Sequence, residues 1–150
     1  MNNLLLLLIL VMMLPVSASS DQVIPMSQHK SGTFYVDVIV ADQPRQKFVV
    51  DTGASHVTIS HRTLKKLLNK KQALFVRSMK GILADGSNID VPVYKVTSLE
   101  IAGVCRFNDV EVAVIKSDTR SVLGLSVLSR AAPFVFNLSP PQLKLSNCPG

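Results

Sequence analysis

The residues best suited to chemistry stand in segment 48–55, Phe-Val-Val-Asp-Thr-Gly-Ala-Ser, where an apolar run ends in an acidic residue. Asp51 follows a predicted buried strand, where a carboxylate is costly to ionise unless it accepts hydrogen bonds. Thr52 offers a hydroxyl, and Gly53 lets the backbone approach closely because it has no side chain. With Ala54 they form a tight turn of small residues. The pattern favours acid–base chemistry at Asp51, within a loop formed by Thr52, Gly53 and Ala54.

Predicted strands surround this turn. Residues 33–40 alternate and are rich in β-branched side chains, 41–44 break the pattern and 46–50 resume it. This predicts a hairpin whose second strand runs straight into Asp51. A short strand is predicted over 57–60.

Segment 62–71 predicts a short amphipathic helix, because Leu64, Leu67 and Leu68 recur at helical spacing. Ser60 is placed to cap it. The segment also carries a basic cluster, formed by Arg62, Lys65, Lys66, Lys70 and Lys71. A solvated helix face explains the cluster, so we expect no nucleic-acid partner. A membrane surface or an acidic partner is the less favoured alternative.

The rest of the chain also favours strands. Asp85-Gly86 lies between two extended stretches and is the strongest short hairpin signal. The second stretch, 88–101, is predicted to be interrupted at Pro92, and a turn then leads to another strand at 110–115.

The C-terminal part adds a short apolar strand that ends in glycine at 122–124 and one or two helical turns at 125–130. Final strands are predicted at 134–136 and 142–145, around two prolines. The fold class is therefore all-β with two short helices.

The first 18 residues read as a signal peptide and not as part of the fold. An almost unbroken apolar run over 4–14 is followed by Pro15 and by the small residues that signal peptidase favours, ending at Ala18. An uncleaved membrane anchor is the alternative, although the run is shorter than the roughly 20 residues that span a bilayer. We expect an exported protein, periplasmic or secreted.

The remaining chain is long enough for one small domain with one core. Residues 19–31 are polar and turn-rich, which predicts a flexible lead-in, and residues 32–150 form the folded domain. The net charge is +6.

The chain has two cysteines, Cys105 and Cys148, and an even number in an exported chain favours a disulfide. Such a bridge would stabilise the fold by about 4 kcal/mol through loop entropy. Two unpaired thiols are the alternative. No His/Cys spacing in the sequence favours a metal, so we expect neither a metal nor a cofactor.

Three features, taken in order, resemble the retropepsin-like aspartic proteases. They are the Asp-Thr-Gly-Ala-Ser motif at 51–55, the glycine-bearing hairpin at 79–93, and the Val-Leu-Gly segment before a short helix. The pattern is most similar to the bacterial exported or membrane-linked members and covers roughly residues 33–145. The resemblance implies a closed single-lobe acid-protease β-barrel with a flap hairpin. The residues that would support the catalytic loop from behind are Val122, Leu123 and Gly124.

The resemblance also implies that the hairpin closes over an extended peptide substrate and excludes water. An ordinary surface turn is the alternative. The candidate flap and substrate-binding residues are Gly81, Ile82, Leu83, Asp85 and Gly86.

Peptide hydrolysis by this chemistry needs two carboxylates that share one proton across a water molecule. The sequence supplies one aspartate in a suitable context, so both carboxylates would be Asp51 from two copies of the chain. We therefore expect a homodimer with the active site on its two-fold axis. The runner-up is a catalytically silent module of the same fold that binds a peptide or forms a dimer.

Two positions depart from the retroviral pattern. Ser55 stands where an acidic residue is usual, and Leu125 stands where an arginine usually follows. The missing ion pair predicts a weak dimer. Ala54 replaces the hydroxyl residue of two-lobed pepsins, and so a pH optimum between mildly acidic and neutral is expected.

Overall fold

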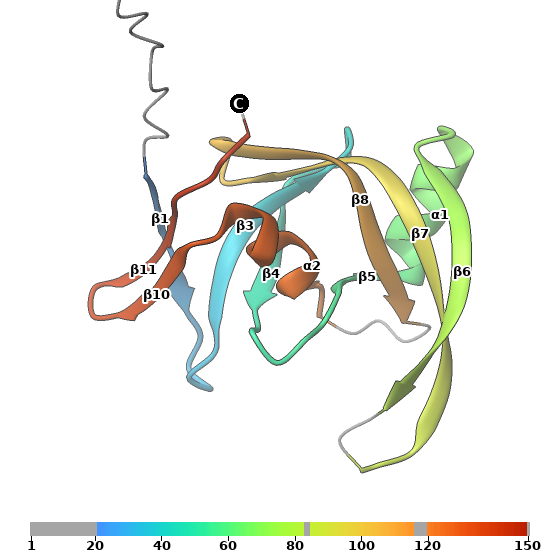
Figure 1. Cartoon of the computed structure of the whole chain (residues 1–150), viewed down its shortest axis with the longest axis horizontal. Coiled ribbons are helices and arrows are strands. Elements are labelled where there is room, and N and C mark those ends of the chain that lie inside the picture. The colour runs from blue at the N-terminus through green and yellow to red at the C-terminus, as the bar shows by residue number, and fades with distance from the viewer. Residues whose placement is uncertain (1–20, 83–84, 116–119, 150) are drawn as a thin grey trace, which may run out of the picture.

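The structure is a computed structural model that describes residues 21–82, 85–115 and 120–149. It is built mainly of strands, with two α-helices and one 3₁₀ turn among these residues (Figure 1). The helical elements are α1 (His61–Asn69), α2 (Leu125–Leu128) and η1 (Ser129–Ala131). The strands are β1 (Gln22–Pro25), β2 (Ser27–Gln28), β3 (Phe34–Val40), β4 (Gln46–Val50), β5 (Val57–Ser60), β6 (Ala73–Ile82), β7 (Asn88–Ile101), β8 (Cys105–Ile115), β9 (Val122–Leu123), β10 (Phe134–Leu138) and β11 (Pro141–Leu145).

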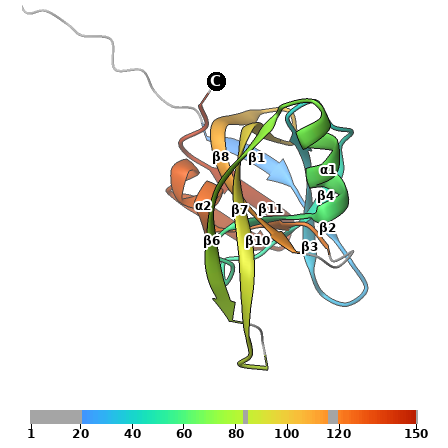
Figure 2. The same ribbon diagram turned by 90° about the vertical axis from the view of Figure 1, so that its right-hand side faces the viewer.

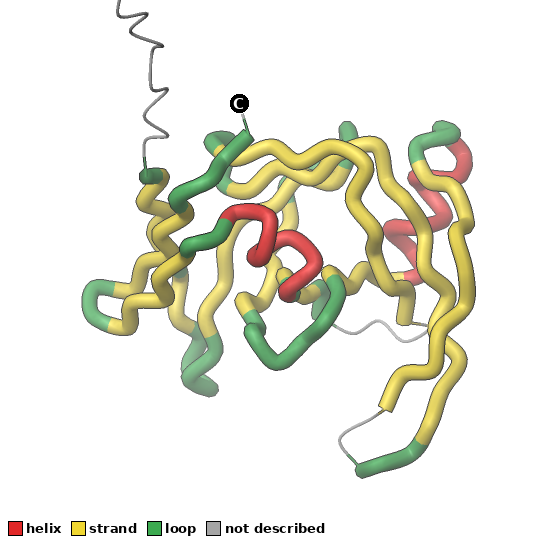
Figure 3. Tube along the Cα trace, viewed as in Figure 1, coloured by secondary structure: helices red, strands yellow, loops and turns green. Residues whose placement is uncertain are grey.

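The main sheet closes on itself. Its strands follow the order β2-β3-β4-β9-β5-β8-β7-β6, and β3 also pairs with β7. This extra pairing joins β3, β4, β9, β5, β8 and β7 into a barrel, whose curved strands enclose the core in the trace of Figure 3. Closure removes two sheet edges that would otherwise be exposed. The predicted closed all-β barrel with two short helices is confirmed.

The core is apolar and lies inside this barrel. It is filled from strands that lie far apart in sequence, including Val36, Phe48, Ile59 and Phe107, each at most 1% exposed. Burial of such side chains is worth about 1.5–3 kcal/mol each. The strand that leads to Asp51 is therefore held on the core by Phe48.

The N-terminal segment differs from the flexible lead-in that its polar composition predicts. β1 pairs with β11 in a three-stranded sheet, β1-β11-β10, and β2 pairs with β3. Ile24 and Met26 are buried in the core. Only two apolar side chains anchor these short strands, which is too weak a pattern to recognise among polar neighbours.

α1 forms where the leucine spacing predicts it. The Ser60 hydroxyl caps it by accepting a hydrogen bond from the Thr63 N–H at 3.2 Å. Leu64 and Leu67 are buried, but Leu68 is 43% exposed and lies outside the packed stripe. No described helix is long and apolar enough to cross a membrane.

β6 and β7 form the longest hairpin of the described chain, and both views show its end projecting beyond the barrel (Figures 1 and 2). β7 continues through Pro92, where an interruption was predicted. At this position β7 pairs only with β6, because the pairing with β8 begins at Val93. A proline is tolerated there, since a strand edge does not need its missing N–H.

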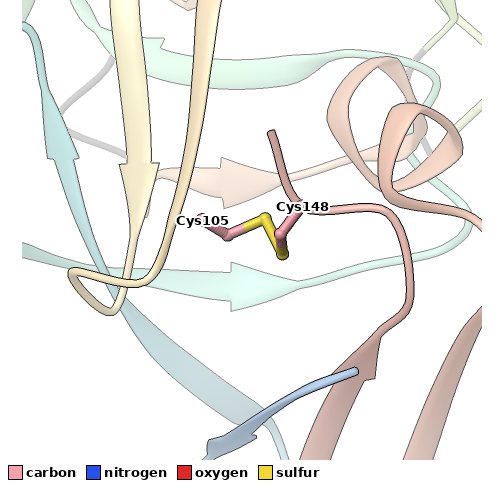
Figure 4. The surroundings of a disulfide bond; sticks show 2 residues. All are labelled: Cys105 and Cys148. Carbon is pink, nitrogen blue, oxygen red and sulfur yellow. A yellow bond between two sulfur atoms is a disulfide. The ribbon is translucent and has the colours of Figure 1, made fainter. Parts of the chain in front are cut away.

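Cys105 and Cys148 form the predicted disulfide, which ties the start of β8 to the C-terminal tail (Figure 4). The Arg106 N–H donates to the Pro149 carbonyl beside it at 3.3 Å. The tail is thus fixed to the end of the barrel away from the β6–β7 tip (Figure 1).

Candidate active site

Asp51 begins the loop between β4 and β5, called the catalytic loop below (residues 51–56). The Asp51 N–H donates to the Leu123 carbonyl at 3.1 Å, which continues the β4–β9 pairing past the end of β4. The Gly53 N–H donates to Asp51 Oδ1 at 2.8 Å. A side chain at position 53 would bring its Cβ to 3.2 Å from the same oxygen. The glycine therefore allows the backbone to fix one carboxylate oxygen.

The start of α2 holds the middle of the catalytic loop. The Leu125 N–H donates to the Ala54 carbonyl at 2.8 Å, and the Ser126 N–H donates to the Ser55 carbonyl at 2.9 Å. The Val57 N–H in turn donates to the Ser126 hydroxyl at 2.9 Å. The first two bonds pair backbone N–H groups at the helix start, which an isolated helix leaves unsatisfied.

Gly124 lies between β9 and α2 with no room for a side chain. A Cβ there would sit 2.3 Å from the His56 carbonyl oxygen and 2.7 Å from the Ala54 carbonyl oxygen. Both contacts are with backbone, which cannot rotate away. The structure thus places the 122–124 segment directly against the catalytic loop, where the resemblance implies it.

The Asp51 side chain is exposed in the single chain, together with Thr52 and Gly53. A carboxylate directly after a buried strand is expected to be buried, but in one copy of the chain Asp51 is exposed. The strand before it is buried, as Val50 is 8% exposed, but Asp51 lies beyond the buried end of that strand. The sequence pattern showed the buried strand and could not show what lies beyond its end.

The predicted flap is the end of the β6–β7 hairpin. Asp85 Oδ1 accepts hydrogen bonds from the Ser87 N–H at 2.9 Å and from the Ser87 hydroxyl at 2.6 Å. These bonds lower the pKa of the Asp85 carboxyl below its usual value. Gly86 takes the positive φ of 82° that the turn requires. Ile82 is 78% exposed, and Leu83 lies outside the described residues.

A cleft of about 380 Å³ lies between the catalytic loop and the hairpin. Gly81 of β6 lines this cleft. A Cβ at position 81 would lie 2.9 Å from Cγ2 of Val91 on the neighbouring strand β7. Residues from both the catalytic loop and the hairpin, two segments that the sequence predicts to be functional, therefore line the same cleft. Its lining residues are Gly53, Ala54, Ser55, His56, Thr58, Met79, Lys80, Gly81, Ile82, Ile89, Val91, Ala113 and Ile115.

Several of these residues were missed by sequence reasoning. Met79, Ile89 and Val91 alternate with outward-facing neighbours along β6 and β7, a signal that could have identified one face of the hairpin. The role of Ser126 had no signal, because its hydroxyl contacts a residue 69 positions away. His56 Nδ1 is buried without a hydrogen-bond partner. No group of three or more candidate metal ligands occurs among the described residues.

The barrel, the braced Asp-Thr-Gly loop and the overhanging hairpin together define the class of retropepsin-like aspartic proteases. The crystal structure of a retropepsin-like aspartic protease from Rickettsia conorii is similar to this chain, with a TM-score of 0.61 and 25% sequence identity. The match covers 85% of this chain and 91% of that one.

A family model, described as gag-polyprotein putative aspartyl protease, matches residues 36–130. The chain belongs to this family. A search of curated proteins gives no sequence match. The matched region includes the catalytic loop, the hairpin and the 122–124 segment.

Proposed function

We propose that the protein is an aspartic endopeptidase that acts as a homodimer and activates water between two copies of Asp51. The observation that carries this proposal is the exposed Asp51 carboxylate, which the Gly53 N–H holds in the loop that follows β4. One copy offers half of the two-carboxylate arrangement that the chemistry requires.

Five of the other described aspartates are engaged elsewhere, which supports a second copy as the source of the missing carboxylate. They form ion pairs with lysines or arginines or, in one case, cap the hairpin turn. These residues are Asp21, Asp37, Asp42, Asp85 and Asp90.

In the proposed mechanism, one Asp51 accepts a proton from the attacking water while the other donates a proton to the peptide carbonyl oxygen. Two adjacent carboxylates cannot both be charged, so the pair holds one proton between reactions. The Gly53 N–H keeps one oxygen of each Asp51 oriented. The braced loop thus maintains the alignment that catalysis needs.

The substrate would be an extended peptide lying in the cleft below the hairpin. The cleft is lined mainly by apolar and small side chains, such as Ala54, Val91 and Ile115. The hairpin offers strand backbone beside it, which suits the pairing of an extended chain. The flap role of Gly81 and Ile82 is part of this proposal.

We further propose that the protein is exported to the periplasm or secreted after removal of residues 1–18, as in bacterial exported members of the class. The apolar leader supports this location. The Cys105–Cys148 disulfide supports it as well, because disulfides persist in oxidising compartments.

Cleavage of a peptide library by the wild type and by Asp51→Asn tests the activity. We expect the variant to lose about 10³-fold in kcat/KM, because the amide cannot accept the water proton. Asp42→Asn is the matched control, since this exposed aspartate pairs with Lys70. Equal behaviour of wild type and Asp51→Asn would leave a peptide-binding or dimerisation module as the function.

The homodimer is tested by measuring activity against protein concentration. Two chains per active site require specific activity to rise with concentration until dimers predominate. Sedimentation should show the dimer over the same range. Constant specific activity down to nanomolar protein would argue against a weak dimer.

A further inference from the structure

A row of side chains crosses the sheet just before Asp51, on the side facing away from the core. Tyr35 of β3 pairs with Val49 of β4, and Val49 pairs with Val122 of β9. All three are half-buried, whereas their neighbours Val36 and Val50 are buried.

The Asp51 side chain belongs to the same side. Side chains two residues apart on a strand point the same way, and Asp51 lies two residues after Val49 with its N–H still in the β4–β9 ladder. Extending the β3–β4 register by two residues brings Thr33 opposite Asp51. The Asp51 carboxylate therefore lies on the same side of the sheet as this row, two residues beyond Val49.

A hydrogen-bond cluster lies on this row. Arg120 Nη1 donates to the Tyr35 phenol oxygen at 3.3 Å, and the Thr33 hydroxyl donates to the same oxygen at 3.5 Å. The bonds from Thr33 and then Arg120 lower the pKa of the Tyr35 phenol. Because the phenol reaches Thr33, the Arg120 guanidinium that contacts it lies toward the Asp51 end of β3.

The donors of this cluster suit an anion. A guanidinium has several N–H donors and no acceptor, and only one of the Arg120 donors is used on Tyr35. The Tyr35 oxygen accepts twice, which leaves its own proton as a donor. A carboxylate only accepts hydrogen bonds, so it complements both groups.

The charges beside the cluster add to this preference. Lys47 lies level with Arg120 when the β4–β9 register is extended. Lys47 and Arg45 both contact one carboxylate, Asp37, at 2.9 Å and 3.9 Å. Arg120 adds a cation that has no carboxylate partner among the described residues, and an acidic group would be attracted to it.

We propose that Arg120, positioned by Tyr35, selects substrates that carry an aspartate or glutamate close to the scissile bond. The Tyr35–Val49 pair lies about two residues, roughly 7 Å, along the strand from Asp51, which is within reach of the side chains nearest the cleaved bond. The inference rests on the proposed protease function. A symmetric dimer would present one cluster on each side of the bond.

Paired peptides that differ only as Glu and Gln at each position near the cleavage site test this selection. The wild type should cleave the best Glu peptide about tenfold more efficiently than its Gln partner, the range for charge-assisted hydrogen bonds. Arg120→Gln should abolish this ratio, mainly by raising KM for the Glu peptide. Arg120→Lys should restore part of it. Arg106→Gln, which removes an arginine of β8 that pairs with Glu100 of β7, is the control.

Tyr35→Phe tests the positioning role. It keeps the ring but removes the oxygen to which Arg120 donates, so the Glu/Gln ratio should fall several-fold while cleavage of the Gln peptide persists. A structural role alone would lower cleavage of both peptides equally.

The outcomes separate this inference from the function on which it rests. Cleavage with a Glu/Gln ratio near one, or a ratio that Arg120→Gln leaves intact, overturns the selection and keeps the protease. An equal loss for both peptides, with weaker dimers in sedimentation, assigns Arg120 to assembly and also overturns the selection. No Asp51-dependent cleavage of any peptide overturns both.

Discussion

The catalytic loop and the β6–β7 hairpin face each other across one cleft, but they are held in different ways. The loop is bonded by backbone to β9 and α2, with Gly124 packed under two carbonyls. The hairpin tip is held by its own turn and by the exposed Lys80–Asp90 pair, with side chains 72% and 71% exposed.

The two kinds of contact contribute different amounts of free energy. Exposed ion pairs contribute roughly 0–1 kcal/mol, whereas loss of a partner for a buried N–H such as that of Val57 costs about 1–3 kcal/mol. Regions with few buried contacts open at low free-energy cost. The loop that carries Asp51 is therefore expected to open less readily than the tip of the hairpin.

The strongest test of this contrast is Gly124→Ala. The new Cβ would overlap two backbone carbonyls, so we expect a loss of about 3 kcal/mol in stability and of most activity. Thermal unfolding measures the first effect and peptide cleavage the second.

Gly32→Ala is the matched control for Gly124→Ala. Gly32 has a positive φ of 85° but nothing within 4 Å of its would-be Cβ. This variant should cost only about 1–2 kcal/mol from backbone conformation. If Gly124→Ala and Gly32→Ala lose equal stability, the close contact of Gly124 with the loop does not explain why the loop is held more firmly than the hairpin.

Gly81→Ala sharpens the contrast from the hairpin side. Its Cβ would meet Val91 Cγ2 at 2.9 Å, a side-chain contact where Gly124 would meet backbone, so stability should fall by about 1–2 kcal/mol. The cleft would become narrower, and we expect about tenfold lower kcat/KM from misplaced substrate. Stability falling as far as in Gly124→Ala would show that the hairpin is also a rigid element.

The sequence predicts those features that depend on neighbouring residues. The alternation at 33–50 predicts the hairpin leading to Asp51, the Asp85-Gly86 dipeptide predicts the turn between β6 and β7, and Ser60 predicts the start of α1. Each is confirmed because the physical cause, pleating, positive φ or capping, acts within a few residues.

Features that depend on distant contacts were not predictable from local sequence patterns, and the closed barrel was expected only from the family resemblance. Barrel closure depends on β3 meeting β7, and the Arg120–Tyr35 bond joins residues 85 positions apart. The exposure of Asp51 depends on what covers the loop, which no local pattern encodes. Ile24 and Met26 gain their burial only from the complete core.

The smallest expected effect is a difference in pH dependence between the turn of the β6–β7 hairpin and the catalytic loop. Hydrogen bonds from Ser87 lower the pKa of Asp85, so they stabilise the turn above the unfolded pKa of about 3.9 and are lost as pH falls through the lower, folded value. The catalytic loop is braced by backbone groups that do not titrate. Amide exchange of Ser87 should therefore accelerate, relative to its intrinsic rate, below about pH 4, while that of Leu125 should not. In Asp85→Asn the Ser87 amide should lose this pH dependence, and its persistence would show that another group controls the turn.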